Sequence, residues 1–106
     1  MASSMSLEEL LAEKDQELER MVAERIMSHV YFAHPAYCSD RNAAAKALEQ
    51  LSAEPVAVQL TFRDTLLALT DEGLVAYPVW ELRLLTTPPR LLMIAALSTI
   101  LEVYGN

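Results

Sequence analysis

Four side chains of metal-binding type lie close together in the first half of the sequence. His29, His34, Cys38 and Asp40 fall within a dozen residues of one another. Imidazole, thiolate and carboxylate are common zinc ligands, but the recurring zinc spacings and a second cysteine are both missing. We therefore expect no metal site in this segment.

The same segment offers the one pairing that suggests nucleophilic catalysis. Cys38 lies four residues after His34, yet no third group and no oxyanion site accompany the pair. Only Gly73 and Gly105 could serve a glycine-rich phosphate loop, which excludes that motif. We expect no enzyme and no cofactor, with Tyr37 and Cys38 filling a gap beneath a loop, where a buried thiol is unreactive.

The stretch from Thr61 to Val75 is the remaining candidate for a site, because its outward face could read a DNA base. Helical spacing turns Phe62, Leu66 and Leu69 inward and leaves Arg63 outward. A bidentate arginine–guanine contact contributes about 1–3 kcal/mol. The neighbouring carboxylates, however, would face the phosphates, and a basic stripe is missing.

Composition sets the limits on the class of protein. The 106 residues are 53% hydrophobic, which predicts one domain with a real core. The formal net charge is −7, from 15 acidic and 8 basic side chains, and disfavours nucleic acid and anionic lipid as partners. One cysteine, no secretory signal pattern and an apolar run of only Leu91–Leu97 indicate a cytoplasmic protein without a membrane span.

A long first helix is predicted from the N-terminal pattern. After a disordered tail at residues 1–5, Ser6 and Glu9 form a capping box that opens a helix continuing to about Ala33. Such a helix would span roughly 40 Å, more than a domain of this size needs. Its first half either projects toward a second copy or a partner, or lays an acidic, solvated face over the chain's own core.

Turn and cap signals divide the middle of the chain. His34-Pro35 ends the first helix, and Ser39 or Asp40 caps a second from Arg41 to about Ser52, whose alanines permit close packing. Residues 56–60 alternate apolar and other side chains, so a short strand competes there with an early start of the third helix.

The C-terminal half is expected to contain a third helix, two strands and a last helix. Thr61 caps the third helix and Gly73 ends it, with strands at residues 74–78 and 79–85. Thr87 caps the last helix, which begins at Pro88 and continues to Tyr104. That helix is apolar nearly all round, and we expect one small domain to bury it incompletely.

The order of residues in the third helix resembles a known family. Thr, an apolar residue, three residues, Leu, two residues, Leu, three residues and Gly-Leu-Val resemble the third helix and first wing strand of MarR and PadR winged helix-turn-helix domains. The resemblance covers about residues 41–104. It implies a mainly α fold with a small β wing, dimerisation through a long N-terminal helix and an apolar C-terminal helix, and DNA contacts from Thr61, Arg63 and Arg83.

The sequence departs from that family at two places. Leu51 to Thr61 leaves an insertion where the family has a short turn, and the Tyr77-Pro78 turn of the wing lacks lysine and arginine. We therefore expect a single winged-helix-like domain over residues 6–106 that serves as a regulatory, non-enzymatic protein-interaction module, as a homodimer or with a protein partner. The alternative is a dimeric DNA-binding transcriptional regulator of the MarR/PadR type.

Two sets of residues follow from this hypothesis. The expected interface residues are apolar positions of the terminal helices, namely Leu11, Leu18, Leu92, Met93, Ile94, Ile100 and Leu101. The expected core consists of Ile26, Val30, Ala44, Leu48, Leu51, Phe62, Leu66, Leu69, Leu74, Trp80, Leu82, Leu97 and Leu101.

Overall fold

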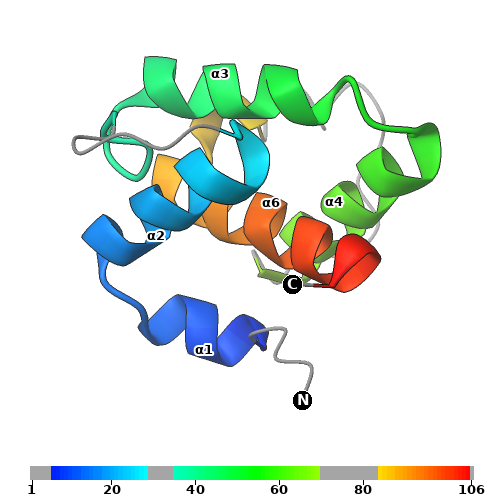
Figure 1. The fold of residues 1–106 in the computed structure, drawn as a ribbon, viewed down its shortest axis with the longest axis horizontal. Helices are drawn as coiled ribbons and strands as arrows, with labels where there is room; N and C mark the ends of the chain where they lie inside the picture. The colour runs from blue at the N-terminus through cyan, green and yellow to red at the C-terminus, as the bar shows by residue number, and fades with distance from the viewer. Residues whose placement is uncertain (1–5, 29–34, 70–83, 106) are drawn as a thin grey trace.

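Helices make up every regular element in the part of the chain that the structure describes. The computed structural model describes residues 6–28, 35–69 and 84–105 (Figure 1). In chain order the elements are α1 (Leu7–Ala12), α2 (Asp15–Met21), the π-helical turn η1 (Val22–Ile26), α3 (Arg41–Leu51), α4 (Val56–Leu69) and α6 (Pro89–Tyr104).

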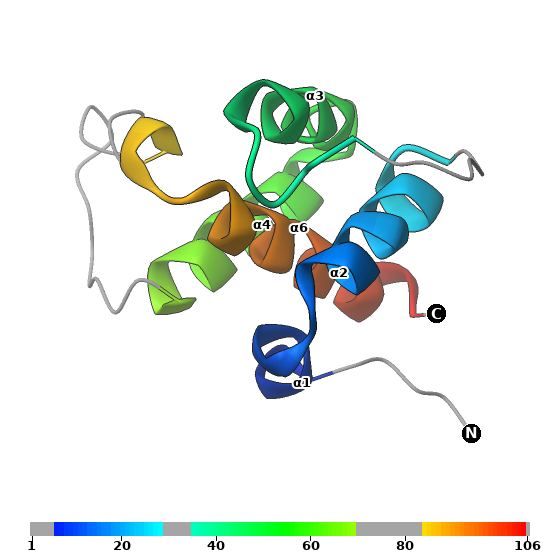
Figure 2. The same cartoon turned by 90° about the vertical axis from the view of Figure 1, so that its left-hand side faces the viewer.

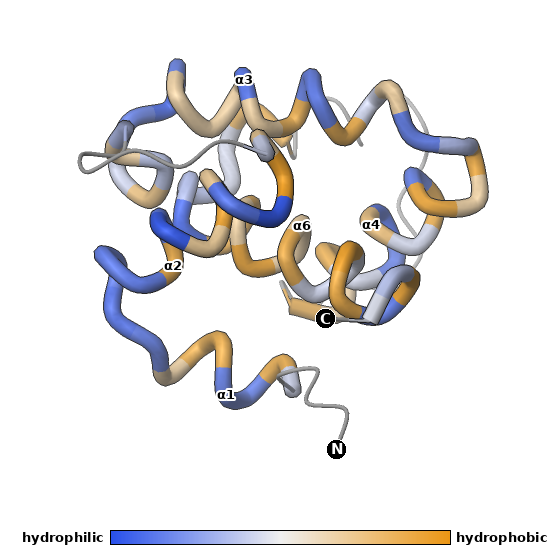
Figure 3. The backbone as a smooth tube through the Cα atoms, viewed as in Figure 1, coloured by the Kyte–Doolittle hydropathy of each residue, from blue (hydrophilic) through white to orange (hydrophobic). Residues whose placement is uncertain are grey.

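The last helix, α6, is the centre of the fold. It contacts α1, α2, η1, α3 and α4, which surround it in the two perpendicular views (Figures 1 and 2). The apolar character of α6 runs along most of its length in Figure 3, and its residues from Leu92 to Leu97 are all buried. The expectation of incomplete burial is therefore wrong for Leu92–Leu97, around which five short elements pack, whereas Val103 and Tyr104 at the end of the helix are exposed.

The predicted single N-terminal helix is instead broken into two. The capping box is confirmed, since Ser6 and Glu9 exchange hydrogen bonds of 2.9 and 3.1 Å, but α1 ends after Ala12. Glu13 and Lys14 are extended, with ψ angles of 155° and 151°. This joint lets Leu10 on α1 and Leu18 on α2 both reach the core, where each is fully buried. Burial against α6 thus outweighs the local tendency to continue the helix.

The end of this N-terminal unit is marked by a π-helical turn. The amide of Met27 donates to the carbonyl oxygen of Val22 at 3.0 Å, an i to i+5 bond. The turn directs Val22, Ala23 and Ile26 into the core. Ser28 follows with a positive φ of 58°, a left-handed conformation that ends the helical path.

The second predicted helix is confirmed as α3. Asp40 is its cap, because its carboxylate accepts a hydrogen bond of 2.9 Å from the amide of Asn42. The alanine stripe is buried at Ala43, Ala44 and Ala47, and α3 packs on α6 and η1. Small side chains on this face allow the close approach that the sequence predicted.

The third helix begins earlier than predicted, at Val56. Residues 56–60 are helical rather than strand, and their amides at Val58 and Gln59 bond to the carbonyl oxygen of Pro55 at 2.9 and 3.2 Å. Thr61 is therefore not a cap. Its hydroxyl lies inside the helix and donates to the carbonyl oxygen of Ala57 at 3.0 Å. The supposed insertion after Leu51 consists of a short turn followed by the first part of α4.

The prediction of a β wing is wrong where the structure describes it. Leu84 and Leu85, placed at the end of the second wing strand, belong to a helical turn at residues 84–86. The remainder of both strands and Gly73 lie outside the described residues. The described residues contain no strand, so a mainly α fold holds and a winged helix with a β wing does not. The last helix begins at Pro89, one residue later than predicted.

Most of the expected core is confirmed where the structure describes it. Leu48 and Leu69 are partly buried and pack against the core, while Val30, Leu74, Trp80 and Leu82 lie outside the described residues. The expected core residues that are buried are Ile26, Ala44, Leu51, Phe62, Leu66, Leu97 and Leu101.

Candidate functional site

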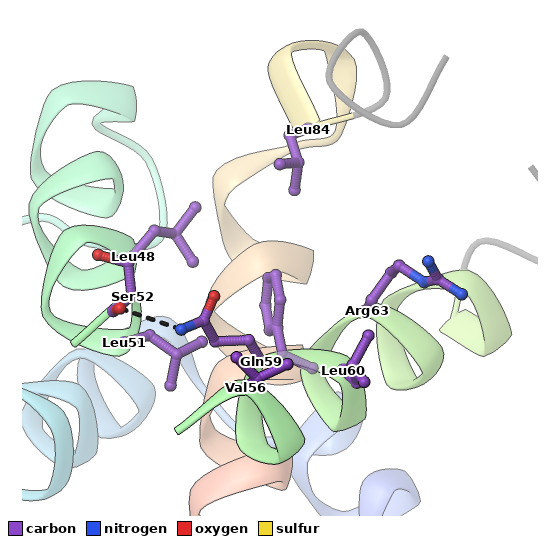
Figure 4. A pocket seen from close by; sticks show the side chains of 9 residues that line it. Leu48, Leu51, Ser52, Val56, Gln59, Leu60, Arg63 and Leu84 are labelled. Carbon is purple, nitrogen blue, oxygen red and sulfur yellow. Dashed lines mark hydrogen bonds between the residues drawn. The ribbon is translucent and has the colours of Figure 1, made fainter. Parts of the chain in front are cut away.

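A groove between α3 and α4 is a concave feature of the described residues with a mainly apolar lining. The end of α3 and the turn after it form one wall, the first half of α4 forms the floor and the other wall, and Leu84 closes the top (Figure 4). Its volume is about 460 Å³. The residues that line it are Leu48, Leu51, Ser52, Val56, Gln59, Leu60, Phe62, Arg63 and Leu84.

The groove has a buried floor and an exposed apolar rim. Leu51 and Phe62 are 4% and 7% exposed and belong to the core. Val56 and Leu60, one helical turn apart on α4, are 69% and 49% exposed. Leu85, beside the groove residue Leu84, is 66% exposed. Since large apolar side chains are concentrated here at a concave surface, the groove resembles a contact surface more than ordinary solvated surface.

The polar groups at the α3 end of the groove are already satisfied within the chain. The side-chain amide of Gln59 donates to the carbonyl oxygen of Ser52 at 3.1 Å (Figure 4) and to that of Glu54 at 2.8 Å. These bonds fix the α3–α4 turn. The described residues of the lining include neither a nucleophile with a partnered base nor a cluster of metal ligands, and what they offer is mainly apolar contact.

Among the described residues that line the groove, Arg63 is the one with a charged side chain. Its Nε atom is buried and finds no hydrogen-bond acceptor among the described residues. The nearest carboxylate oxygen, on Asp64, lies 3.9 Å away, beyond hydrogen-bond distance, and the Asp64 side chain is 73% exposed. Among the described residues, the guanidinium group therefore has no acceptor for its Nε hydrogen, and in Figure 4 it extends away from Leu48 and Leu51.

The predicted interface residues divide between core and surface. Leu11 is 42% exposed and Ile100 is partly buried against the core. The other members are buried inside the single chain, so the argument that they need a second chain does not apply to them. These buried members are Leu18, Leu92, Met93, Ile94 and Leu101.

Among the described residues, the structure does not bring the predicted DNA-contacting residues together. The hydroxyl of Thr61 is used inside α4, and Arg63 lines the apolar groove beside a carboxylate. Arg83 lies outside the described residues. The sequence analysis identified Arg63 as outward-facing but missed the groove. The available signal was the spacing of Val56 and Leu60, which are one helical turn apart. Once residues 56–60 are assigned to a helix, this spacing indicates an exposed apolar face.

The residues first considered for metal binding or catalysis have structural roles where they are described. Asp40 caps α3, and Tyr37 and Cys38 are buried as predicted. The amide of Cys38 donates to the Glu19 carboxylate at 3.1 Å. His29 and His34 lie outside the described residues. Within the described ranges no three candidate metal ligands come together.

Cys38 should resist thiol reagents in the folded protein. Burial, assisted by the negative charges of Asp15 and Glu19, raises the pKa of the Cys38 thiol to about 12. A raised pKa favours the neutral thiol, so little thiolate forms at pH 8, whereas an unfolded cysteine has a pKa of about 8.5. We expect iodoacetamide to alkylate the native protein about a hundredfold or more slowly than the denatured protein. A native rate near that of a free thiol would contradict this burial.

Comparison of the chain with protein-family models, with curated proteins and with solved structures found no match. Among the helices that the structure describes, none combines the length and the apolar character needed to cross a membrane.

Proposed function

We propose that this protein is a non-enzymatic, regulatory protein-interaction module that receives a helical segment of a protein partner in the α3–α4 groove. The single observation that carries the proposal is the apolar groove of about 460 Å³ with Val56 and Leu60 exposed at its rim. An amphipathic helix that places one apolar face in a groove is a recurring mode of peptide recognition.

A small molecule fits this surface less well than a helix. Ligand pockets of similar volume bury about 70–90% of a small ligand. Here Val56 and Leu60 are 69% and 49% exposed, so one side of the groove is open to water and would leave a small ligand largely solvated. A helix covers the open side with its own backbone and outer side chains.

A homodimer through the terminal helices remains part of the proposal, but with fewer residues available for its interface. Only Leu11 and Ile100 of the predicted interface retain exposed area, together with Val103 and Tyr104 at the end of α6. DNA binding stays a prediction, and the contacts of the described residues give no support for it. Strong retention on heparin that falls steeply with salt would favour it.

Matched substitutions test whether the groove is the contact surface. Leu60→Glu places a charge at the groove, whereas Val103→Glu places the same charge on α6 at a residue of similar exposure, 43% against 49%. We expect co-purification of a partner from the native cell to fall about tenfold or more for Leu60→Glu and to stay unchanged for Val103→Glu, because burying an unpaired carboxylate is costly. Circular dichroism checks that both variants are folded.

The reverse outcome would contradict the groove proposal. Loss of the partner with Val103→Glu alone would assign the contact to the terminal helices. Light scattering of the same two variants then tells whether that contact joins two copies of the chain of 11.8 kDa.

A further inference from the structure

We propose that Arg41 is a positioning residue for the α3–α4 groove. Its guanidinium group holds the helical turn at residues 84–86, and Leu84 of that turn then limits the size of the apolar side chain that the groove accepts. This inference rests on the proposed function and deepens it by adding what selects the partner. The juxtaposition that carries it is a pair of hydrogen bonds from Arg41 to the carbonyl oxygens of Leu84 and Thr87, next to the groove that Leu84 lines.

Arg41 occupies a place in α3 that does not favour a positive charge. It is the first residue of the helix, directly after the cap Asp40, where the free amides and the helix dipole favour negative charge. Its guanidinium group instead reaches the carbonyl oxygens of Leu84 at 3.5 Å and Thr87 at 2.9 Å, 43 and 46 residues further along the chain. These distant acceptors, and not the stability of α3, account for an arginine at this position.

The turn at residues 84–86 needs hydrogen-bond donors from outside its own segment. In a continuing helix the amide of residue 88 would donate to the carbonyl oxygen of Leu84, but residue 88 is proline and has no N–H. Arg41 supplies a donor to that oxygen from α3. A single helical turn is not stable through its own backbone bonds, so its position depends on contacts of this kind.

Leu84 connects the turn to the groove. Its side chain points from the turn toward the groove in Figure 4 and is partly buried against the core. Displacement of the turn would withdraw Leu84 from the lining and enlarge the groove. Since an oversized side chain in a packed apolar site is costly, a Leu84 held in place sets an upper size limit for the partner's apolar anchor.

A purely structural role for Arg41 makes a different prediction. If its hydrogen bonds only stabilised the folded chain, their loss would weaken the binding of every peptide by the same factor, through a smaller fraction of competent protein. A positioning role changes the preference among anchors of different size, because the side chain that limits their size is the one displaced.

A peptide selection followed by replacement of the anchor tests the inference. The probes are displayed amphipathic helical peptides selected on the native protein and measured by fluorescence anisotropy, and alanine replacement identifies the apolar anchor of each. The anchor is then exchanged for the next larger side chain: leucine for phenylalanine, phenylalanine for tryptophan, or tryptophan for naphthylalanine. We expect this enlargement to weaken binding to the native protein about tenfold or more, and binding to Arg41→Met about threefold or less.

Three further variants serve as controls. Arg25→Met removes the same charge from an exposed residue of η1 outside the described lining and should behave as the native protein does. Arg41→Lys keeps the charge and a donor for the Thr87 carbonyl oxygen, and should retain the native preference. Leu84→Ala should tolerate the enlarged anchor, and adding Arg41→Met to it should change the preference no further, because the side chain that Arg41 positions is gone.

Two results would overturn the inference. One is an equal loss from the enlarged anchor on the native protein and on either Arg41→Met or Leu84→Ala. The other is a uniform weakening of all peptides by Arg41→Met, with the same factor in the presence and absence of Leu84→Ala. Circular dichroism checks that each variant is folded, and Leu84→Ala alone decides the outcome if Arg41→Met does not fold.

Leu60→Glu separates this failure from failure of the proposed function. If Leu60→Glu abolishes binding while Arg41→Met leaves the anchor preference unchanged, the groove is a docking site and only the inference fails. If Leu60→Glu leaves binding unchanged, or if the selection yields no peptide, the groove is not a docking site and both proposals fail.

Discussion

Leu66→Ala is expected to destabilise the protein by about 3 kcal/mol, the largest effect of any single substitution proposed here. Leu66 is fully buried on α4 and belongs to the same core as Met93, Ile94 and Leu97 of α6, which are also fully buried. Shortening it removes apolar contact and leaves a cavity that a close-packed core fills only partly. In a domain of this size the melting temperature should fall by about 10–20 °C.

Leu60→Ala is the matched control for Leu66→Ala. Both residues are leucines on α4, but Leu60 is 49% exposed at the groove. Its shortening should change the free energy of unfolding by no more than about 0.5 kcal/mol. Equal effects of the two substitutions in urea unfolding would mean that the packing of α4 on α6 is assigned incorrectly.

Arg90→Met is expected to destabilise the protein by about 2 kcal/mol and to loosen α1 selectively. Arg90 on α6 donates to the carbonyl oxygens of Leu11 and Glu13, each at 2.8 Å, and pairs with Asp15. These three acceptors belong to the joint between α1 and α2. Since the joint breaks the helix, its carbonyl groups lack ordinary helical partners, and Arg90 supplies one charged group for several of them.

Arg20→Met is the control for Arg90→Met. Arg20 also makes ion pairs, with Glu17 and Glu24, but all three are on the surface of the same helical segment and are 37–44% exposed. Such exposed pairs contribute about 0–1 kcal/mol. Hydrogen exchange should therefore accelerate in α1 for Arg90→Met and remain unchanged there for Arg20→Met. Unchanged exchange in both would show that Arg90 does not hold the joint.

Signals between residues close in the sequence predicted the helix caps and helix ends that depend on local interactions. The capping box at Ser6, a cap at Asp40 as one of two candidates and the last helix to within one residue were predicted because each depends on residues close in the chain. The break at Glu13 and Lys14 was missed because its contacts are distant in the chain: Leu10 and Leu18 are buried in the core that α6 forms, and Arg90, 77 residues after Glu13, donates to the Glu13 carbonyl oxygen. No periodicity within the first helix contains that information.

One premise of the dimer prediction, that most of α6 is left uncovered by its own chain, is wrong for a related reason. The apolar surface of α6 was recognised correctly, but its covering was attributed to a second chain. A straight helix to residue 33 would leave α6 partly bare, whereas the bent segment returns Leu10 and Leu18 to its surface. The candidate groove was missed because residues 56–60 fit either a strand or a helix, and only the helix places Val56 and Leu60 along one rim.

The most direct test of the docking groove is amide chemical-shift mapping of the isotope-labelled protein during titration with an amphipathic helical peptide selected for binding to it. The account predicts that the largest shifts occur along the end of α3, the first half of α4 and Leu84, the elements that line the groove. Shifts confined to Leu11, Val103 and Tyr104, with the groove residues unchanged, would contradict the account.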